Sequence, residues 1–124
     1  MEMKQTIYIT GEDLQRLRQI LPRGGGSPYL RTLESRLEGA SVVPEAPRDV
    51  VTIGSRFRMR DVETDHVAEY TLVLPELADI NRGRISVLAP IGALLLGAQE
   101  QETITFSTPD STRRLRIEAV VDED

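Results

Sequence analysis

The sequence predicts an α+β fold in which two short helices precede a mostly antiparallel sheet wrapped around a third short helix. Three observations carry this prediction. Residues 11–38 contain two segments with apolar residues at helical spacing. Residues 50–121 contain several segments in which apolar and polar residues alternate, as in half-buried strands. The nearly uninterrupted apolar run 90–97 needs neighbouring elements on every side, which a curved sheet supplies.

Cap residues define the two N-terminal helices. Thr10 and Asp13 stand in capping-box positions, and Pro22 closes the apolar pattern that follows. Ser27 and Pro28 favour the start of the second helix, which has one apolar face formed by Tyr29, Leu30, Leu33 and Leu37. Joined by glycines, the two helices are expected to form an antiparallel hairpin about 16 Å long.

Composition divides the chain into three expected parts. The short helical hairpin covers residues 1–40, and a linker over 41–48 is indicated by two prolines among small residues. The sheet domain covers residues 49–124. Its expected strands include Val50–Ile53, a segment in which Phe57 and Met59 are buried, and a last strand with Leu115, Ile117 and Ala119 on its buried face.

The most informative stretch is residues 84–97, which reads as a short buried strand running directly into a short helix. Ile85 and Val87 are typical strand residues, and Pro90 suits the first helical position because its missing N–H needs no partner there. Gly97 stands where the helix needs a residue in the left-handed conformation.

Composition also limits the function. The net charge of −5 argues against autonomous nucleic-acid binding, and no apolar run is long enough to span a membrane. The absence of cysteine excludes disulfides and thiolate metal sites and fits a cytoplasmic protein. The N-terminus lacks the apolar core of a signal peptide.

No catalytic, cofactor-binding or metal-binding residues are predicted. His66 is the only histidine, and its polar surroundings favour a solvated turn residue. The triple glycine 24–26 follows a helix rather than a strand and has no neighbouring lysine, so it lacks the features of a phosphate-binding loop.

The run Ile85–Gly97, read as ISVLAPIGALLLG, resembles the signature of the C-terminal domain of Gre transcription factors. It is more similar still to the regulator of nucleoside diphosphate kinase (Rnk) family, which shares that domain. The resemblance runs from about Asp49 to Val121 and includes the segment beginning Asp49-Val50-Val51-Thr52. It implies an FKBP-like fold preceded by a coiled-coil hairpin, and RNA polymerase as the partner.

The hairpin tip departs from the Gre pattern. Gre factors insert a long coiled coil into the secondary channel of RNA polymerase, where acidic tip residues help bind a catalytic magnesium ion. Here the tip is formed by Pro22, Arg23, Gly24, Gly25 and Gly26. It has no carboxylate, the ligand that magnesium prefers, and Arg23 would repel a cation. The resemblance therefore implies a factor without cleavage activity.

Two further surfaces are candidates for contact with polymerase. The Gre docking loop matches Leu88, Ala89 and Pro90, where Leu88 and Ala89 replace the polar pair of Gre factors, which implies a more apolar contact. After the central helix, Gln101-Glu102 replaces a frequent Gly-Asp, so a different turn shape is expected. A possible basic contact face consists of Arg56, Arg58, Arg60, Arg114 and Arg116.

The leading hypothesis is a non-catalytic RNA polymerase-binding regulator, docked at the rim of the secondary channel in competition with Gre factors. One alternative is an interaction module that regulates nucleoside diphosphate kinase by another route. Another is an FKBP-type prolyl isomerase, which the small number of aromatic residues disfavours, since Phe57 and Phe106 are expected in the core. The sequence leaves the oligomeric state open, including whether the hairpin leucines pair in a dimer or pack on the sheet.

Overall fold

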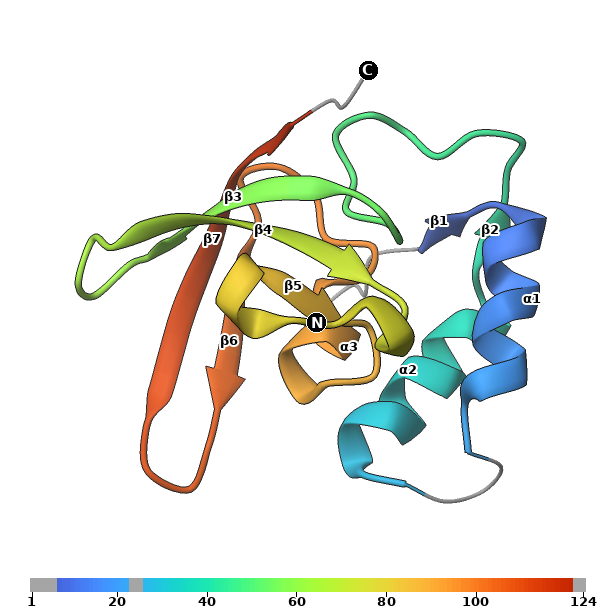
Figure 1. The fold of residues 1–124 in the computed structure, drawn as a ribbon, viewed down its shortest axis with the longest axis horizontal. Helices are drawn as coiled ribbons and strands as arrows, with labels where there is room; N and C mark the ends of the chain where they lie inside the picture. The colour runs from blue at the N-terminus through green and yellow to red at the C-terminus, as the bar shows by residue number, and fades with distance from the viewer. Residues whose placement is uncertain (1–6, 23–25, 122–124) are drawn as a thin grey trace.

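The computed structural model describes residues 7–22 and 26–121 and confirms the α+β fold class (Figure 1). Helices α1 (Gly11–Ile20) and α2 (Pro28–Glu38) precede a curled sheet, and α3 (Pro90–Leu95) lies between the sheet and α2. The sheet has the order β5-β4-β3-β7-β6, with the strands β3 (Arg56–Asp61), β4 (Val67–Val73), β5 (Arg84–Ser86), β6 (Thr103–Ser107) and β7 (Thr112–Val121).

The sheet is mixed because one of its strand pairs is parallel. β4 and β5 run in the same direction, whereas the other neighbouring strands are antiparallel. The connection between β4 and β5 contains two short 3-10 helices, η1 (Pro75–Leu77) and η2 (Ile80–Arg82), and returns the chain to the end of the sheet at which β4 begins. This connection places β5 at the sheet edge, so that its end delivers the chain directly into α3.

The expected helix caps are present. The Thr10 hydroxyl accepts a hydrogen bond from the Asp13 N–H at 3.2 Å, and the Ser27 hydroxyl accepts one from the Leu30 N–H at 3.3 Å. Pro28 occupies the first turn of α2, as predicted.

The segment around residue 50 differs from the expected strand. Val50–Ile53 contains one isolated bridge, from Val50 to Gln99, in place of a regular strand. Its remaining ladder contacts go to the chain after α3: the Val51 N–H donates to the Ala98 carbonyl, and the Gly97 N–H donates to the Val51 carbonyl, both at 2.8 Å. A turn at Thr52–Ser55 then redirects the chain into β3.

Residues 41–48 also include regular structure. β2 (Ser41–Val42) pairs in parallel with β1 (Tyr8–Ile9), so the chain before α1 lies beside the chain after α2. The pairing forms a separate two-stranded sheet that joins the two ends of the helical pair to each other, on the right of Figure 1.

A β-bulge changes which residues of β7 face the core. The register of β3 with β7 shifts between Arg58 and Met59, so that Val120 lies opposite Phe57 and Ala119 lies opposite Arg58. Val120 packs against the core, and the prediction of Ala119 on the buried face is therefore wrong. Simple alternation fails there because the bulge inserts one extra residue into the strand.

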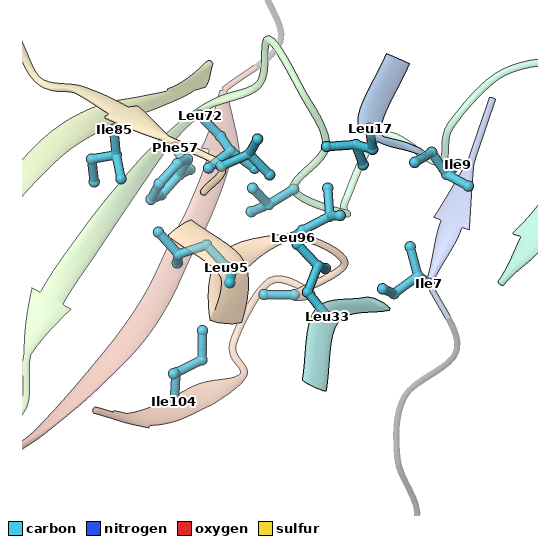
Figure 2. Packing of buried hydrophobic residues seen from close by; sticks show 14 of the residues in the cluster. Ile7, Ile9, Leu17, Leu33, Phe57, Leu72, Ile85, Leu95, Leu96 and Ile104 are labelled. Atoms are coloured by element: carbon cyan, nitrogen blue, oxygen red, sulfur yellow. The ribbon is translucent and has the colours of Figure 1, made fainter. Parts of the chain in front are cut away.

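One hydrophobic core joins the helices, α3 and the sheet (Figure 2). Leu17 of α1 and Leu33 of α2 are completely buried, as are Leu95 and Leu96 at the end of α3. The buried hairpin leucines therefore pack on the domain core. Other fully buried members of the cluster are Ile7, Ile9, Val51, Phe57, Leu72, Val87 and Ile117.

Candidate functional site

The loop Leu88–Pro90 is held in a tight turn by Ser86 at the end of β5. The Leu88 N–H donates to the Ser86 hydroxyl at 3.0 Å, and the Ala89 N–H donates to the Ser86 carbonyl at 3.0 Å. Leu88 and Ala89 are half-buried against the core, whereas Pro90 is exposed at the first turn of α3. Of the three residues, Pro90 thus presents the most surface to a partner.

Gly92 allows this loop to be so compact. A Cβ atom at this position would lie 1.9 Å from the Ser86 carbonyl oxygen and 3.1 Å from the Val87 Cα atom. Since no side chain fits into such a gap, glycine is required for the close approach of α3 to the end of β5. The sequence motif contains this glycine, but only the geometry shows what it does.

Arg36 of α2 holds the other end of α3. Its guanidinium donates to the Ala93 carbonyl at 3.3 Å and to the Leu96 carbonyl at 3.0 Å, both otherwise free at a helix C-terminus. Burial lowers the pKa of Arg36, and the nearby Glu102 carboxylate partly offsets that effect. Gly97 has a φ of +87°, as predicted, and a Cβ atom there would meet Ile7 at 2.9 Å.

Gln101 adopts the left-handed conformation, with a φ of +73°. The Gly-Asp of the resembling family would reach this conformation more easily, because glycine has no Cβ atom to clash. Here the Gln101 side-chain amide donates to the Glu118 carbonyl at 2.9 Å, and this bond helps to hold the strained turn.

The hairpin tip is only partly described. Arg23, Gly24 and Gly25 lie outside the described residues, while Pro22 and Gly26 on either side are exposed. The Arg31 side chain donates to the Gly26 carbonyl at 3.0 Å, which places a cation beside the tip. Within residues 7–22 and 26–121, no cluster of three or more histidine or acidic residues could hold a metal ion.

The concave face of the sheet contains a cleft of about 310 Å³ beside the start of α3. Its walls come from all five strands of the sheet, from η2 and from α3, and they are mostly apolar. The polar wall residues are Asp61, His66 and Arg113. The apolar and aromatic wall residues are Met59, Tyr70, Ile80, Ile85, Ile91, Phe106 and Leu115. Phe57 is in the core as expected, but Phe106 is half-buried and lines this cleft. The sequence does not predict this cleft because its walls come from segments that are far apart in the chain.

An ion pair stands in the cleft wall. The Arg113 guanidinium donates to the Asp61 carboxylate at 2.7 Å, and the same carboxylate accepts from the Glu63 and Thr64 N–H groups at 3.0 and 3.2 Å. Asp61 is only 8% exposed, so burial alone would raise its pKa, but these three donors outweigh burial and lower it. Asp61 is therefore a fixed anion that orients Arg113.

The five arginines of the basic face lie on adjoining strands, β3 and β7, with Arg60 directly opposite Arg116. Carboxylates accompany them. Glu69 lies near Arg56 and Arg58, Glu118 and Asp65 contact Arg60 at 2.9 and 3.4 Å, and Glu63 contacts Arg114 at 2.6 Å. Arg116 acts electrostatically on Glu118, where hydrogen bonding from Arg60 is the largest cause of a lowered pKa. The face is therefore nearly neutral rather than strongly basic.

The sequence signature of the family described as "Transcription elongation factor, GreA/GreB, C-term" matches residues 46–122, which include β3 to β7, α3 and the loop. A solved structure described as a prokaryotic transcription elongation factor GreA/GreB from Nitrosomonas europaea superposes with a TM-score of 0.82. It is 34% identical and covers 96% of this chain and 100% of that chain. The GreA factor homolog 1 (Gfh1) of Thermus thermophilus, at 19% identity and a TM-score of 0.54, shares the fold.

The chain belongs to the family defined by the GreA/GreB C-terminal domain. Within it, the chain is 34% identical to the regulator of nucleoside diphosphate kinase of Escherichia coli K12 over 110 residues, which is 86% of this chain and 81% of the relative. GreA of Clostridioides difficile is 37% identical over 87 residues, and the alignment covers 68% of this chain but only 55% of GreA. None of the helices within the described residues is long and apolar enough to cross a membrane.

Proposed function

We propose that this protein is a non-catalytic regulator that binds bacterial RNA polymerase in the cytoplasm, with the loop Leu88–Pro90 docked at the rim of the secondary channel. The observation that carries the proposal is the rigid mounting of this loop. Ser86, Gly92 and Arg36 fix α3 from both ends, and the exposed Pro90 projects from its first turn. A preorganised apolar loop binds with little loss of conformational entropy.

The nature of the tip supports a regulator without cleavage activity. The tip residues Pro22 to Gly26 include no carboxylate, and Arg31 adds a positive charge beside them. A second metal ion at the polymerase active centre requires oxygen ligands, which this tip does not offer. By occupying the same rim, the protein would compete with Gre cleavage factors and so modulate elongation.

A competition experiment with bacterial core RNA polymerase tests the docking. We expect binding that excess GreA displaces, and a loss of about tenfold or more in affinity for Pro90→Asp. An acidic residue is favourable in the first turn of a helix, so this variant should keep the fold. Pro109→Asp, at an exposed proline in the turn between β6 and β7, is the matched control. Binding that neither GreA nor Pro90→Asp affects would refute the proposed docking.

A transcript-cleavage assay on backtracked complexes tests the absence of catalysis. We expect no stimulation of cleavage by this protein alone and a dose-dependent decrease of GreA-stimulated cleavage when both are present. Stimulated cleavage by this protein alone would contradict the non-catalytic part of the proposal, while leaving the docking intact.

The name of the Escherichia coli relative favours a second candidate, the regulation of nucleoside diphosphate kinase. Such regulation could act through transcription or by a separate route. Pro90→Asp distinguishes them in cells. If kinase levels still respond to a variant that no longer binds polymerase, the regulation uses another route.

A further inference from the structure

The cleft beside α3 has the size and chemistry of a pocket for one amino-acid side chain. Its volume of about 310 Å³ is at the lower end of the range for ligand pockets, which suits a single large side chain better than a cofactor. Seven of its ten wall residues are apolar or aromatic, including the rings of Tyr70 and Phe106. Such walls favour an aliphatic or aromatic occupant because burial removes apolar surface from water.

Arg113 gives the cleft a charge preference. The Asp61 carboxylate accepts a hydrogen bond from one guanidinium N–H of Arg113 and accepts two more from backbone N–H groups. The fixed carboxylate therefore fixes the orientation of the arginine. The Arg113 side chain is still 53% exposed, and a guanidinium has five N–H donors. The Asp61–Arg113 pair is neutral as a whole, but the guanidinium donors that Asp61 leaves unused favour a carboxylate on the occupant next to its apolar group.

The rim of the cleft joins the docking loop. Ile91, which follows Pro90 in the chain, is part of the cleft wall. Ile80 stands on the opposite element, η2, and is 67% exposed, the largest exposed fraction among the large apolar side chains of the described residues. Ile80 therefore extends the apolar surface of the cleft out to its rim, and a contiguous apolar surface of this kind is the type that a partner covers.

We infer that the cleft receives one apolar side chain of the partner docked at Leu88–Pro90, presented by a segment in which a carboxylate lies beside that side chain and binds Arg113. The inference rests on the proposed function for the partner, RNA polymerase. It adds a specificity pocket that recognises an acidic–apolar segment and lies outside the docking loop.

Paired variants test the pocket in the polymerase-binding assay. Ile80→Asp places a negative charge at the mouth of the cleft, and Arg113→Gln removes the cation; each should weaken binding about tenfold, which corresponds to about 1.4 kcal/mol. Leu77→Asp is the control for the first, since Leu77 is 57% exposed on the neighbouring η1 and does not line the cleft. Arg16→Gln is the control for the second, since Arg16 is 50% exposed and paired with a carboxylate, like Arg113, but lies on α1 and does not line the cleft. Both controls should bind within about twofold of the wild type.

Cleft variants that bind polymerase as well as the wild type would overturn the inference, even if Pro90→Asp abolishes binding and thereby supports the docking loop. If Arg113→Gln lowers the stability of the fold, Ile80→Asp decides the test, because the exposed position of Ile80 tolerates an aspartate.

A titration with small ligands tests the cleft itself, without polymerase, and its result does not depend on the proposed function. The full chain labelled with ¹⁵N is titrated with N-acetyl-leucine, which carries an apolar group and a carboxylate, and with uncharged N-acetyl-leucinamide. We expect saturable shifts at the amides of Ile91, Phe106 and Arg113, with a dissociation constant on the order of millimolar. The carboxylate should bind about three- to fivefold more tightly than the amide, and Arg113→Gln should abolish this difference. Absent cleft shifts, or equal affinity for both probes, would refute the inference.

Discussion

The close approach of α3 to β5 predicts a severe effect for Gly92→Ala. The added Cβ atom would lie 1.9 Å from the Ser86 carbonyl oxygen, and contacts under 3.0 Å do not occur at real Cβ atoms, so the backbone has to move by about 1 Å. The neighbours are backbone atoms of Ser86 and Val87 and cannot rotate away. The turn that holds Leu88–Pro90 therefore has to change shape.

The magnitude follows from two opposing effects. Overpacking of a well-packed region costs about 1 to 3 kcal/mol, with the upper end appropriate for a clash with backbone. The higher helix propensity of alanine than of glycine offsets this by up to about 1 kcal/mol in the free energy of unfolding. We expect a net loss of about 2 kcal/mol in the free energy of unfolding. Gly11→Ala is the matched control, since a Cβ atom there has an ordinary contact of 3.7 Å with Val42, and it should stabilise by about 0.5 kcal/mol.

Urea unfolding monitored by circular dichroism measures both variants under the same conditions. Since both replace glycine within a helix, the difference between them isolates the clash. Equal free energies of unfolding for Gly92→Ala and Gly11→Ala would show that the loop backbone moves aside without loss of stability. The docking loop would then not be rigid.

Three further changes test other contacts. Arg36→Met should lower the free energy of unfolding by about 2 kcal/mol, because two carbonyls at the end of α3 lose their donor, whereas Arg31→Met at an exposed site should have little effect. Ser27→Ala should cost about 1 kcal/mol by removing the cap of α2, as measured by urea unfolding. The pKa of Asp61 is lowered in the folded state, so its contribution to stability is present above the usual value of 3.8 and is lost as the pH falls through the lowered value. Urea midpoints measured from pH 6 to pH 2 should therefore fall less steeply for Asp61→Asn than for the wild type.

Local signals in the sequence were sufficient to predict the elements that depend on local contacts. Thr10, Ser27 and Pro28 define the helix starts because caps act on backbone groups within one turn. The alternation around Phe57 and Met59 predicts the buried face of β3 because side chains of a strand point to opposite sides in turn.

Features that depend on distant parts of the chain were not predictable. Val50–Ile53 has strand-like residues, but its partner is the segment after α3 rather than a neighbouring strand. The bulge in β7 leaves no mark in the alternating pattern, so the pattern predicts the wrong face for Ala119. Arg36 appears in the sequence as one polar residue of a helix, and only the packing of α2 on α3 gives it two carbonyls to cap.

The candidate site shows the same division. The loop Leu88–Pro90 is predictable because the strand, the proline and the apolar helix are contiguous in sequence, while its role in docking stays a prediction. The cleft is not predictable because residues 61 and 113 are far apart in the chain, and nothing in the sequence separates Asp61 from the other polar residues of its turn.

Because the contacts that hold α3 lie away from Pro90, the effect of a substitution on polymerase binding can be measured separately from its effect on stability. Pro90 lies on the exposed side of a helix that Gly92 seats on β5 and Arg36 caps from α2. If the loop binds as a preformed surface, Pro90→Asp should weaken polymerase binding at unchanged stability, because it alters only the contact. Arg36→Met should weaken binding because α3 loses the donor at its end, and Arg36→Lys, which restores a cationic donor there, should recover part of both the stability and the affinity. If Arg36→Lys recovers the stability but none of the affinity, Arg36 itself, or the face of α2 around it, touches the partner.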